Sequence, residues 1–280
     1  MRTQSDIQVV VTPERRHRFN IGENKLYQDY RESRPFQTRD DVNFKVFIHE
    51  LCLFPRKWGL AINFVCNKDL THLTTLIEAQ YLPSIAYFAA LRPARKIILE
   101  KHEHYEKQTY RNRCYINAVQ GRVALIVPLT AKHGKVPISE VRIDHSQKWL
   151  NNHWRSLRSA YGKAPFFEHY SHDLEKVLFK KQEFLYDLNF DLLSMCLKWL
   201  NWDVSVEASL SYDPAPDQPI SDLRSVINPK KAVNLSRFYH PARYYQVFGN
   251  TFAENLSLVD LIFCEGPKAA AIVQLSTTAK

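Results

Sequence analysis

A chain of 280 residues, 45% of them hydrophobic, can bury a sizeable core as one large domain or as one domain with an extension. Its 7 glycines form neither GxGxxG nor GxxxxGK[ST], which argues against nucleotide binding through those phosphate loops. The formal net charge of +9 suits an anionic partner, although without a run of five basic residues it is equally typical of a solvated surface.

The five cysteines are dispersed and form no CxxC pair, which disfavours a disulfide scaffold and a structural zinc site. A reducing, cytoplasmic compartment fits this pattern. The N-terminus lacks the apolar core of a signal peptide, and the most apolar early stretch, residues 42–66, is interrupted by charges. We therefore expect a soluble protein without a membrane span.

Residues 1–72 show scattered charges of both signs and prolines and glycines that interrupt any periodicity. We expect a weakly structured N-terminal extension here. The alternatives are an added subdomain or a translation start that is set too far upstream. The folded domain is expected over residues 73–280.

Secondary structure becomes clear from Leu76 onward. Residues 76–79 predict a strand, residues 85–91 a short helix that ends before Pro93, and residues 96–99 a second strand. A strand, a helix and a strand within about 25 residues are typical of a parallel unit.

The next segments predict more strands and then mainly helices. Residues 110–116 and 123–129 are expected to pair as a hairpin around Gln120-Gly121, and residues 136–143 alternate as a further strand. Helices are predicted over residues 145–161, 166–170, 173–186, 189–200, 221–227 and 258–264, with a candidate strand over 204–212 and a last helix after Gly266-Pro267. The fold class is therefore α/β, with a central mixed sheet built from residues 75–145 and covered by helices mainly from residues 145–275.

Chemistry-bearing side chains are concentrated in residues 99–116, between two apolar runs. In an extended segment Arg111 and Arg113 share one face and Asn112 points to the other. Paired guanidinium groups suit a phosphate or a carboxylate. The alternative is that both arginines form structural ion pairs with acidic groups such as Glu100 or Glu103.

Glu100, His102 and His104 alternate in the same stretch. They fit a metal-binding trio, a set of groups for acid and base chemistry, or a polar rim. We favour proton transfer by Glu100 or a histidine over a metal site, and no metal or cofactor is assigned.

Two further side chains have a structural and a chemical interpretation. His153, in the predicted helix 145–161, is either a satisfied, semi-buried residue or a second group for proton transfer. Cys114 directly follows Arg113 and is either a buried inert thiol or a nucleophile.

The order of short motifs resembles the WbqC-like protein family, as in a Bacteroidetes-type member, over about residues 75–275. The blocks that carry the resemblance include Gln80-Tyr81-Leu82-Pro83, Ile98-Leu99-Glu100, Tyr110-Arg111-Asn112-Arg113, His153-Trp154-Arg155-Ser156, Asp222-Leu223-Arg224 and Glu265-Gly266-Pro267. Many members carry an acidic pair and Gln after the second strand, whereas this chain has Glu100-Lys101-His102.

The resemblance implies a place in O-antigen or other surface polysaccharide biosynthesis. A transferase-type enzyme that acts on a nucleotide-activated sugar, or on its acyl or amino substituent, is the expected function. The alternatives are a non-catalytic assembly factor in polysaccharide synthesis and a basic nucleic-acid-binding protein, of which the second is the less expected. The expected partner is a small phosphorylated or nucleotide-linked ligand.

The candidate site residues follow from these arguments. Because the carboxyl ends of parallel strands meet at one edge of a sheet, the groups that leave the first two strands are expected in one cleft. Glu100 and His153 are the candidates for proton transfer. The candidates for substrate binding are Gln80, Tyr81, Tyr105, Lys107, Arg111, Asn112, Arg113 and Arg155.

Overall fold

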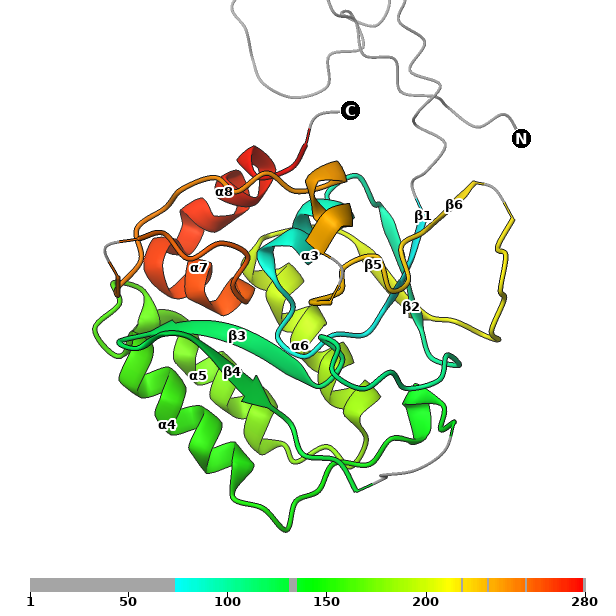
Figure 1. Cartoon of the computed structure of the whole chain (residues 1–280), viewed down its shortest axis with the longest axis horizontal. Coiled ribbons are helices and arrows are strands. Elements are labelled where there is room, and N and C mark those ends of the chain that lie inside the picture. The colour runs from blue at the N-terminus through cyan, green and yellow to red at the C-terminus, as the bar shows by residue number, and fades with distance from the viewer. Residues whose placement is uncertain (1–73, 131–134, 218, 231, 250, 279–280) are drawn as a thin grey trace, which may run out of the picture. The chain divides into compact units, whose positions relative to one another are not determined.

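The computed structural model describes residues 74–130, 135–217, 219–230, 232–249 and 251–278. The expectation for residues 1–72 lies outside this part of the chain. A four-stranded parallel sheet has the strand order β5-β2-β1-β6 (Figure 1). Strands β1 (Thr74–Glu78) and β2 (Lys96–Glu100) form its centre, while β5 (Ser205–Ala208) and β6 (Ile220–Asp222) form its edges.

The predicted parallel unit is confirmed. Helix α3 (Ile85–Leu91) connects β1 to β2, and all seven of its residues are buried. A helix that is apolar on all sides can be stable only where other elements surround it. The register of the two strands places Glu78 beside Glu100 at their carboxyl ends.

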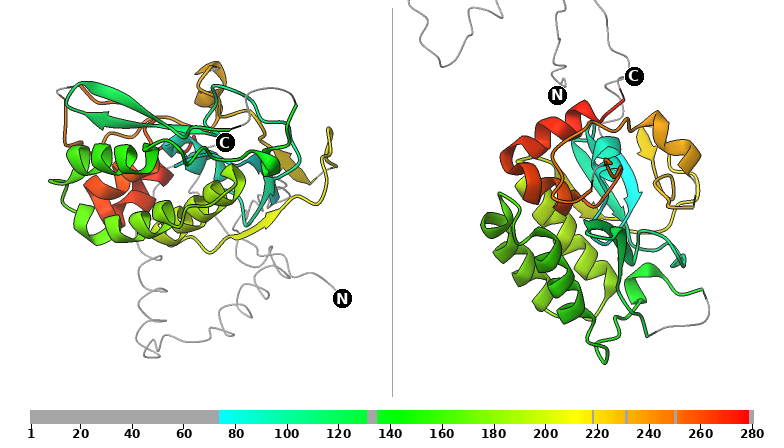
Figure 2. Two further views of the ribbon diagram at one scale, coloured as in Figure 1. Left: turned by 90° about the horizontal axis from the view of Figure 1, so that it is seen from below. Right: turned by 60° about the vertical axis from the view of Figure 1, so that its left-hand side comes forward.

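The predicted hairpin is also confirmed, as strands β3 (Arg113–Ala118) and β4 (Gly121–Ile126). Gly121 has a φ of +92°, a value that glycine adopts without strain. The hairpin forms a second, antiparallel sheet and does not extend the parallel one, as one central sheet would have required. It packs against a layer of helices that includes residues 149–161, as Figure 2 shows.

The segment 136–143 is not the strand that its alternation predicts. It contains a 3-10 turn, η3 (Ile138–Glu140), which follows Pro137. Ile138 and Val141 are both buried, and this spacing of three residues matches a helical turn better than the two-residue period of a strand.

Three long helices form one layer: α4 (Trp149–Tyr161), α5 (Phe167–Phe179) and α6 (Leu185–Trp199). The sequence predicts two helices over 166–170 and 173–186. In the structure α5 continues through both predicted ranges as far as Phe179, and the end of the second range is the start of α6. Residues 221–227, expected to be helical, instead contribute to β6 and to the turn after it. The α/β class with helices packed around parallel and antiparallel strands is confirmed.

Near the C-terminus lie helices α7 (Leu258–Glu265) and α8 (Ala269–Leu275). Ser257 caps α7 as predicted, because its hydroxyl accepts a hydrogen bond from the Val259 N–H. The same hydroxyl donates to the Leu82 carbonyl at 2.8 Å. Ser257 therefore joins this helix to the loop that follows β1.

Replacement of Ser257 by alanine is expected to lower the free energy of unfolding by about 1–3 kcal/mol, because it removes a helix cap and leaves a buried carbonyl without its donor. Urea unfolding followed by circular dichroism measures the loss. Ser194→Ala is the matched control, because the Ser194 hydroxyl only donates to the Phe190 carbonyl within α6. Equal losses in the two variants would contradict the role of Ser257.

Candidate functional site

Two buried glutamates end the two central strands. Glu78 is the last residue of β1 and Glu100 is the last residue of β2, and each is 1% exposed. Their parallel register brings both carboxylates to the same edge of the sheet. This is the edge at which open α/β sheets bind their ligands.

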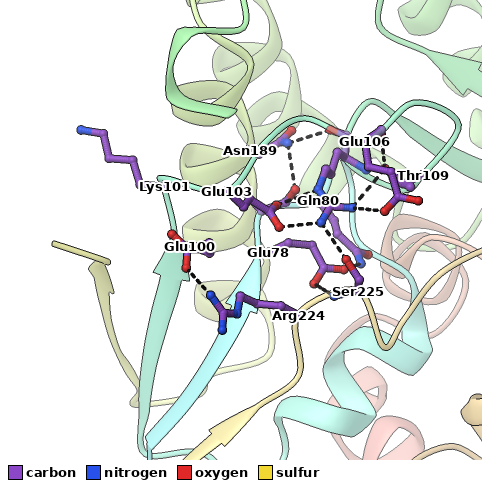
Figure 3. Close-up of polar contacts among 12 residues, drawn as sticks. Glu78, Gln80, Glu100, Lys101, Glu103, Glu106, Thr109, Asn189, Arg224 and Ser225 are labelled. Carbon is purple, nitrogen blue, oxygen red and sulfur yellow. Dashed lines mark hydrogen bonds and ion pairs between the residues drawn. The ribbon is translucent and has the colours of Figure 1, made fainter. Parts of the chain in front are cut away.

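Glu100 faces a guanidinium group. Its Oε2 accepts a hydrogen bond from Arg224 Nη1 at 2.9 Å (Figure 3). Its Oε1 accepts from the Ser209 hydroxyl at 2.7 Å. Arg224 follows β6 and also pairs with Asp222 at 2.6 Å. The charge of Glu100 is therefore balanced inside the protein.

Glu78 is held by two nitrogen donors and forms no ion pair with another described residue. Its Oε1 accepts from Gln80 Nε2 and its Oε2 from the Ser225 backbone N–H, both at 2.7 Å. Burial raises the pKa of Glu78, while the charge of Arg111 opposes the rise. Glu78 therefore keeps a proton to higher pH than an exposed glutamate would.

The guanidinium group of Arg111 is paired with a carboxylate inside the protein. Its Nε and Nη2 donate to the two carboxylate oxygens of Glu103, both at 2.7 Å, and the arginine is only 2% exposed. Nη2 also donates to the Ser225 hydroxyl at 3.0 Å. Of the two interpretations given for Arg111, the structure therefore shows the ion pair, with Glu103 as the partner. We name Glu78, Gln80, Glu100, Glu103, Arg111, Arg224 and Ser225 the strand-end cluster (Figure 3).

The backbone around the strand-end cluster is strained. Leu82, Gln108 and Ser225 have φ values of 41°, 59° and 57°, in the left-handed region that residues other than glycine rarely adopt. Such conformations cost free energy, and they gather at ligand sites and switch regions. Ser225 is the most direct case, because its strained backbone also supplies a donor to Glu78.

Arg113 differs from Arg111. It is half-buried at the start of β3, its Nε has no hydrogen-bond partner, and no ion pair joins it to any carboxylate in the described part of the chain. Its charge acts on Tyr105: burial raises the pKa of Tyr105, and the charges of Arg113 and Arg111 oppose that rise. Tyr105 thus lies close to both arginines.

Glu106 lies between Arg111 and a further cation, because it is 3.7 Å from Arg111 Nη1 and 3.9 Å from Lys230 Nζ. Lys107 is exposed, and Lys230 donates from Nζ to the Lys107 carbonyl at 2.9 Å. Asn112 is buried, with its Nδ2 bonded to the Val127 carbonyl and its Oδ1 without a partner. Gln80 Oε1 and Asn189 Oδ1 are likewise buried acceptors without partners. Each of these oxygens is free to accept from a ligand or a water molecule.

The structure does not bring all predicted site residues together. Tyr81 follows Gln80 but points away from the strand-end cluster, and its hydroxyl contacts His153 Nδ1 at 2.9 Å. The ring of Trp149 lies edge-on to that of His153, at 5.1 Å between centroids. Arg155 is exposed on α4. The single cleft predicted from sequence is therefore wrong for Tyr81, His153 and Arg155.

His153 has a structural environment. Burial lowers its pKa to about 4, and the backbone of Ile126 provides a second hydrogen bond to the ring. A neutral imidazole that accepts from Tyr81 and donates to a carbonyl satisfies both nitrogens. Cys114 also matches the structural alternative, since it is 1% exposed and burial raises the pKa of its thiol.

Sequence reasoning missed Glu78, Arg224, Ser209 and Ser225. The rule that selects Glu100 also applies to Glu78, because Glu78 too is the last residue of a buried strand. Arg224 was quoted only as part of a motif, and its pairing depends on β6 lying next to β1. No local pattern indicates the two serines.

The described part of the chain has neither a metal-binding cluster nor a membrane-spanning helix. No group of three or more His, Cys, Asp or Glu side chains there could hold a metal ion. His104, the third member of the alternating trio, is exposed, whereas Glu100 is buried. Among the helices of the same residues, none has the length and apolar character needed to cross a bilayer.

Replacement of Arg111 by methionine is expected to lower the free energy of unfolding by about 3–5 kcal/mol, because Glu103 would remain as an unpaired buried charge. The double variant Arg111→Met, Glu103→Leu removes both charges and should recover much of this loss. Arg155→Ala changes an exposed arginine and should stay within about 0.5 kcal/mol of the parent. Chemical denaturation measures all three, and a small loss for Arg111→Met alone would contradict the buried pair.

The low pKa of His153 predicts a pH dependence of stability. Neutral His153 is favoured in the fold, so its contribution is complete above the unfolded pKa of about 6.5 and is lost as the pH falls toward 4. At pH 4 this loss amounts to about 3 kcal/mol. His153→Gln keeps a donor and an acceptor without a charge, so its stability relative to the parent should increase by that amount between pH 7 and pH 4. A constant difference across this range would contradict the assignment.

Comparison with known proteins gives one match. Searches of curated proteins and of solved structures return none. The model of the WbqC-like protein family matches residues 78–241, a range that begins at Glu78 and includes every member of the strand-end cluster. The match covers more than half of the chain, so the chain belongs to the WbqC-like protein family.

Proposed function

We propose that the protein is a transferase-type enzyme of surface polysaccharide biosynthesis, of the O-antigen kind. Its substrate is a nucleotide-activated sugar, and the group transferred is the sugar or its acyl or amino substituent. Membership of the WbqC-like family supports this proposal. The position of the strand-end cluster, at the carboxyl edge of a parallel sheet, supports a ligand site there.

The observation that carries the proposal is that the guanidinium group of Arg113 has no carboxylate partner among the described residues. A half-buried guanidinium without a carboxylate partner in the described residues is a costly arrangement unless an anion completes it. Its planar set of N–H donors matches two oxygens of one phosphate. Tyr105, whose phenol lies within range of this charge, adds a hydroxyl donor. The diphosphate of an activated sugar fits this combination.

The two strand-end carboxylates supply different proton chemistry. Glu100 is held by the guanidinium of Arg224, whereas burial raises the pKa of Glu78. Two carboxylates in unlike environments are typical of an acid and a base that work as a pair. In this proposal Arg224 shifts from Glu100 to a ligand oxygen, and Glu100 accepts the proton of the acceptor hydroxyl as that oxygen bonds to the transferred sugar. The bond between the sugar and the diphosphate breaks, the nucleoside diphosphate leaves as an anion beside Arg113, and Glu78 keeps its proton. His153 has no part in the transfer, because its ring is fully bonded elsewhere.

A non-catalytic assembly factor is the second candidate, and one observation favours it. Glu100, Glu103 and Arg111 are all paired and buried in the structure, as expected for a purely structural network. Such a factor has no use for a nucleotide-sugar ligand. Binding of that ligand through Arg113 therefore distinguishes the two functions.

Arg113→Ala is expected to weaken the binding of a nucleoside diphosphate by about 1.5–3 kcal/mol, which is about ten- to 150-fold in Kd. Isothermal titration calorimetry with UDP, GDP, UDP-glucose and GDP-mannose measures the change. Arg155→Ala is the matched control, because it also removes one guanidinium but from the exposed face of α4. Its Kd should stay within about twofold of the parent.

Two outcomes would contradict the proposal. One is that none of the four nucleotides binds the full chain. The other is that Arg113→Ala and Arg155→Ala weaken binding equally, because binding would then reflect only the net positive charge. Either result leaves the assembly factor as the better function.

A further inference from the structure

A cavity of about 530 Å³ lies away from the strand-end cluster, where the C-terminal end of α6 meets α8. No residue of the strand-end cluster lines it. Its size falls in the range of about 300–1,000 Å³ that is usual for small-molecule sites. Neither the proposed transfer reaction nor the packing of the core accounts for it.

The floor of the cavity is aromatic. Tyr170 and Trp199 are each 9% exposed, and their rings meet edge to face at 5.4 Å between centroids. Trp202 also lines the cavity and is half-buried, with the Arg92 guanidinium 5.5 Å from the centre of its ring. Ala270 and Ala271 of α8 line it as well and carry only methyl groups.

The rim of the cavity is polar. Arg92, Asn201 and Gln274 are exposed and line its edge. Arg92 Nη2 and Gln274 Oε1 are 3.4 Å apart, so this contact is long for a hydrogen bond and is readily exchanged for a ligand group. Among the described residues that line the cavity, Arg92 carries the one formal charge, which disfavours a cationic ligand.

This combination matches the two surfaces of a sugar ring. A pyranose has an apolar face of C–H groups, which packs on aromatic rings, and an edge of hydroxyls, which needs amide and guanidinium partners. A phosphate would leave the aromatic floor without a partner, and a hydrocarbon would bury the polar rim.

We propose that this cavity binds one sugar residue of the acceptor saccharide. The inference rests on the proposed function, since an enzyme that elongates or modifies a polysaccharide must also hold the acceptor. A subsite apart from the activated donor serves a chain of several sugar residues, because it anchors the acceptor beyond the residue that reacts.

Ala271→Trp fills the cavity from α8 and tests the inference. Leu275→Trp is the matched control: it adds the same ring to the same helix, at a position that is 73% exposed and does not line the cavity. The probes are the methyl glycosides of glucose, galactose, N-acetylglucosamine, rhamnose and glucuronate, titrated into the full chain and followed by saturation-transfer NMR. At least one glycoside should bind the parent and Leu275→Trp alike and bind Ala271→Trp at least tenfold more weakly.

Gln274→Ala is a second variant for the case in which Ala271→Trp does not fold, and it should weaken the same glycoside severalfold. No binding of any glycoside, or binding that survives both substitutions, would overturn the inference. Loss of glycoside binding in Arg113→Ala would also overturn it, because the sugar would then lie at the anion site.

The same titrations separate this inference from the proposed function. Glycoside binding that depends on Ala271, combined with no nucleotide binding, leaves a sugar site in a protein that is not the proposed transferase. Nucleotide binding that depends on Arg113, without any glycoside binding, leaves the transferase and removes the acceptor site.

Discussion

The structure around the sheet edge depends on the buried ion pair between Arg111 and Glu103. Charges that leave water lose several kcal/mol of hydration, so they are tolerated only where good geometry and further hydrogen bonds compensate the loss. Here the further hydrogen bonds come from three segments. Thr109, in the same loop as Glu103 and Arg111, accepts from Arg111 Nη1, Ser225 after β6 accepts from Nη2, and Asn189 of α6 donates to the Arg111 carbonyl at 2.8 Å. The pair therefore fixes how these segments meet.

The same ion pair determines which groups remain for chemistry. Because Glu103 satisfies Arg111 on two sides, the positive charge beside Tyr105 that is available to a ligand belongs to Arg113. Because Arg111 is close to Glu78, it also limits how far burial raises the pKa of that carboxyl. One structural contact thus sets the electrostatic environment of both the proposed anion site and Glu78.

Local elements of this fold were predictable where the sequence carries its own signal. The buried helix of residues 85–91 and the cap at Ser257 depend on composition and on one hydroxyl, and both were predicted. The strands β5 and β6 were not recognised as parts of the sheet, because they pair with β2 and β1 from more than 100 residues away. A three-residue strand such as β6 has too few residues to show a period.

The residues of the candidate site were likewise predictable only where the sequence carries a local signal. The rule that polar groups gather at the ends of parallel strands placed Gln80 and Glu100 at the sheet edge where they lie in the structure, and applied evenly it would have selected Glu78. It could not separate Arg111 from Arg113, because only the folded chain shows which arginine meets a carboxylate. It also placed Tyr81 with Gln80, although neighbouring residues in an extended segment point in opposite directions.

The short edge strands of the parallel sheet bear on how the protein behaves at high concentration. β5 and β6 pair with their neighbours over only four and three residues. Another chain that adds to a sheet pairs with a long row of unpaired backbone N–H and C=O groups. A very short edge strand does not provide such a row. The parallel sheet is therefore a poor template for aggregation through strand addition, even though its two central strands are largely buried.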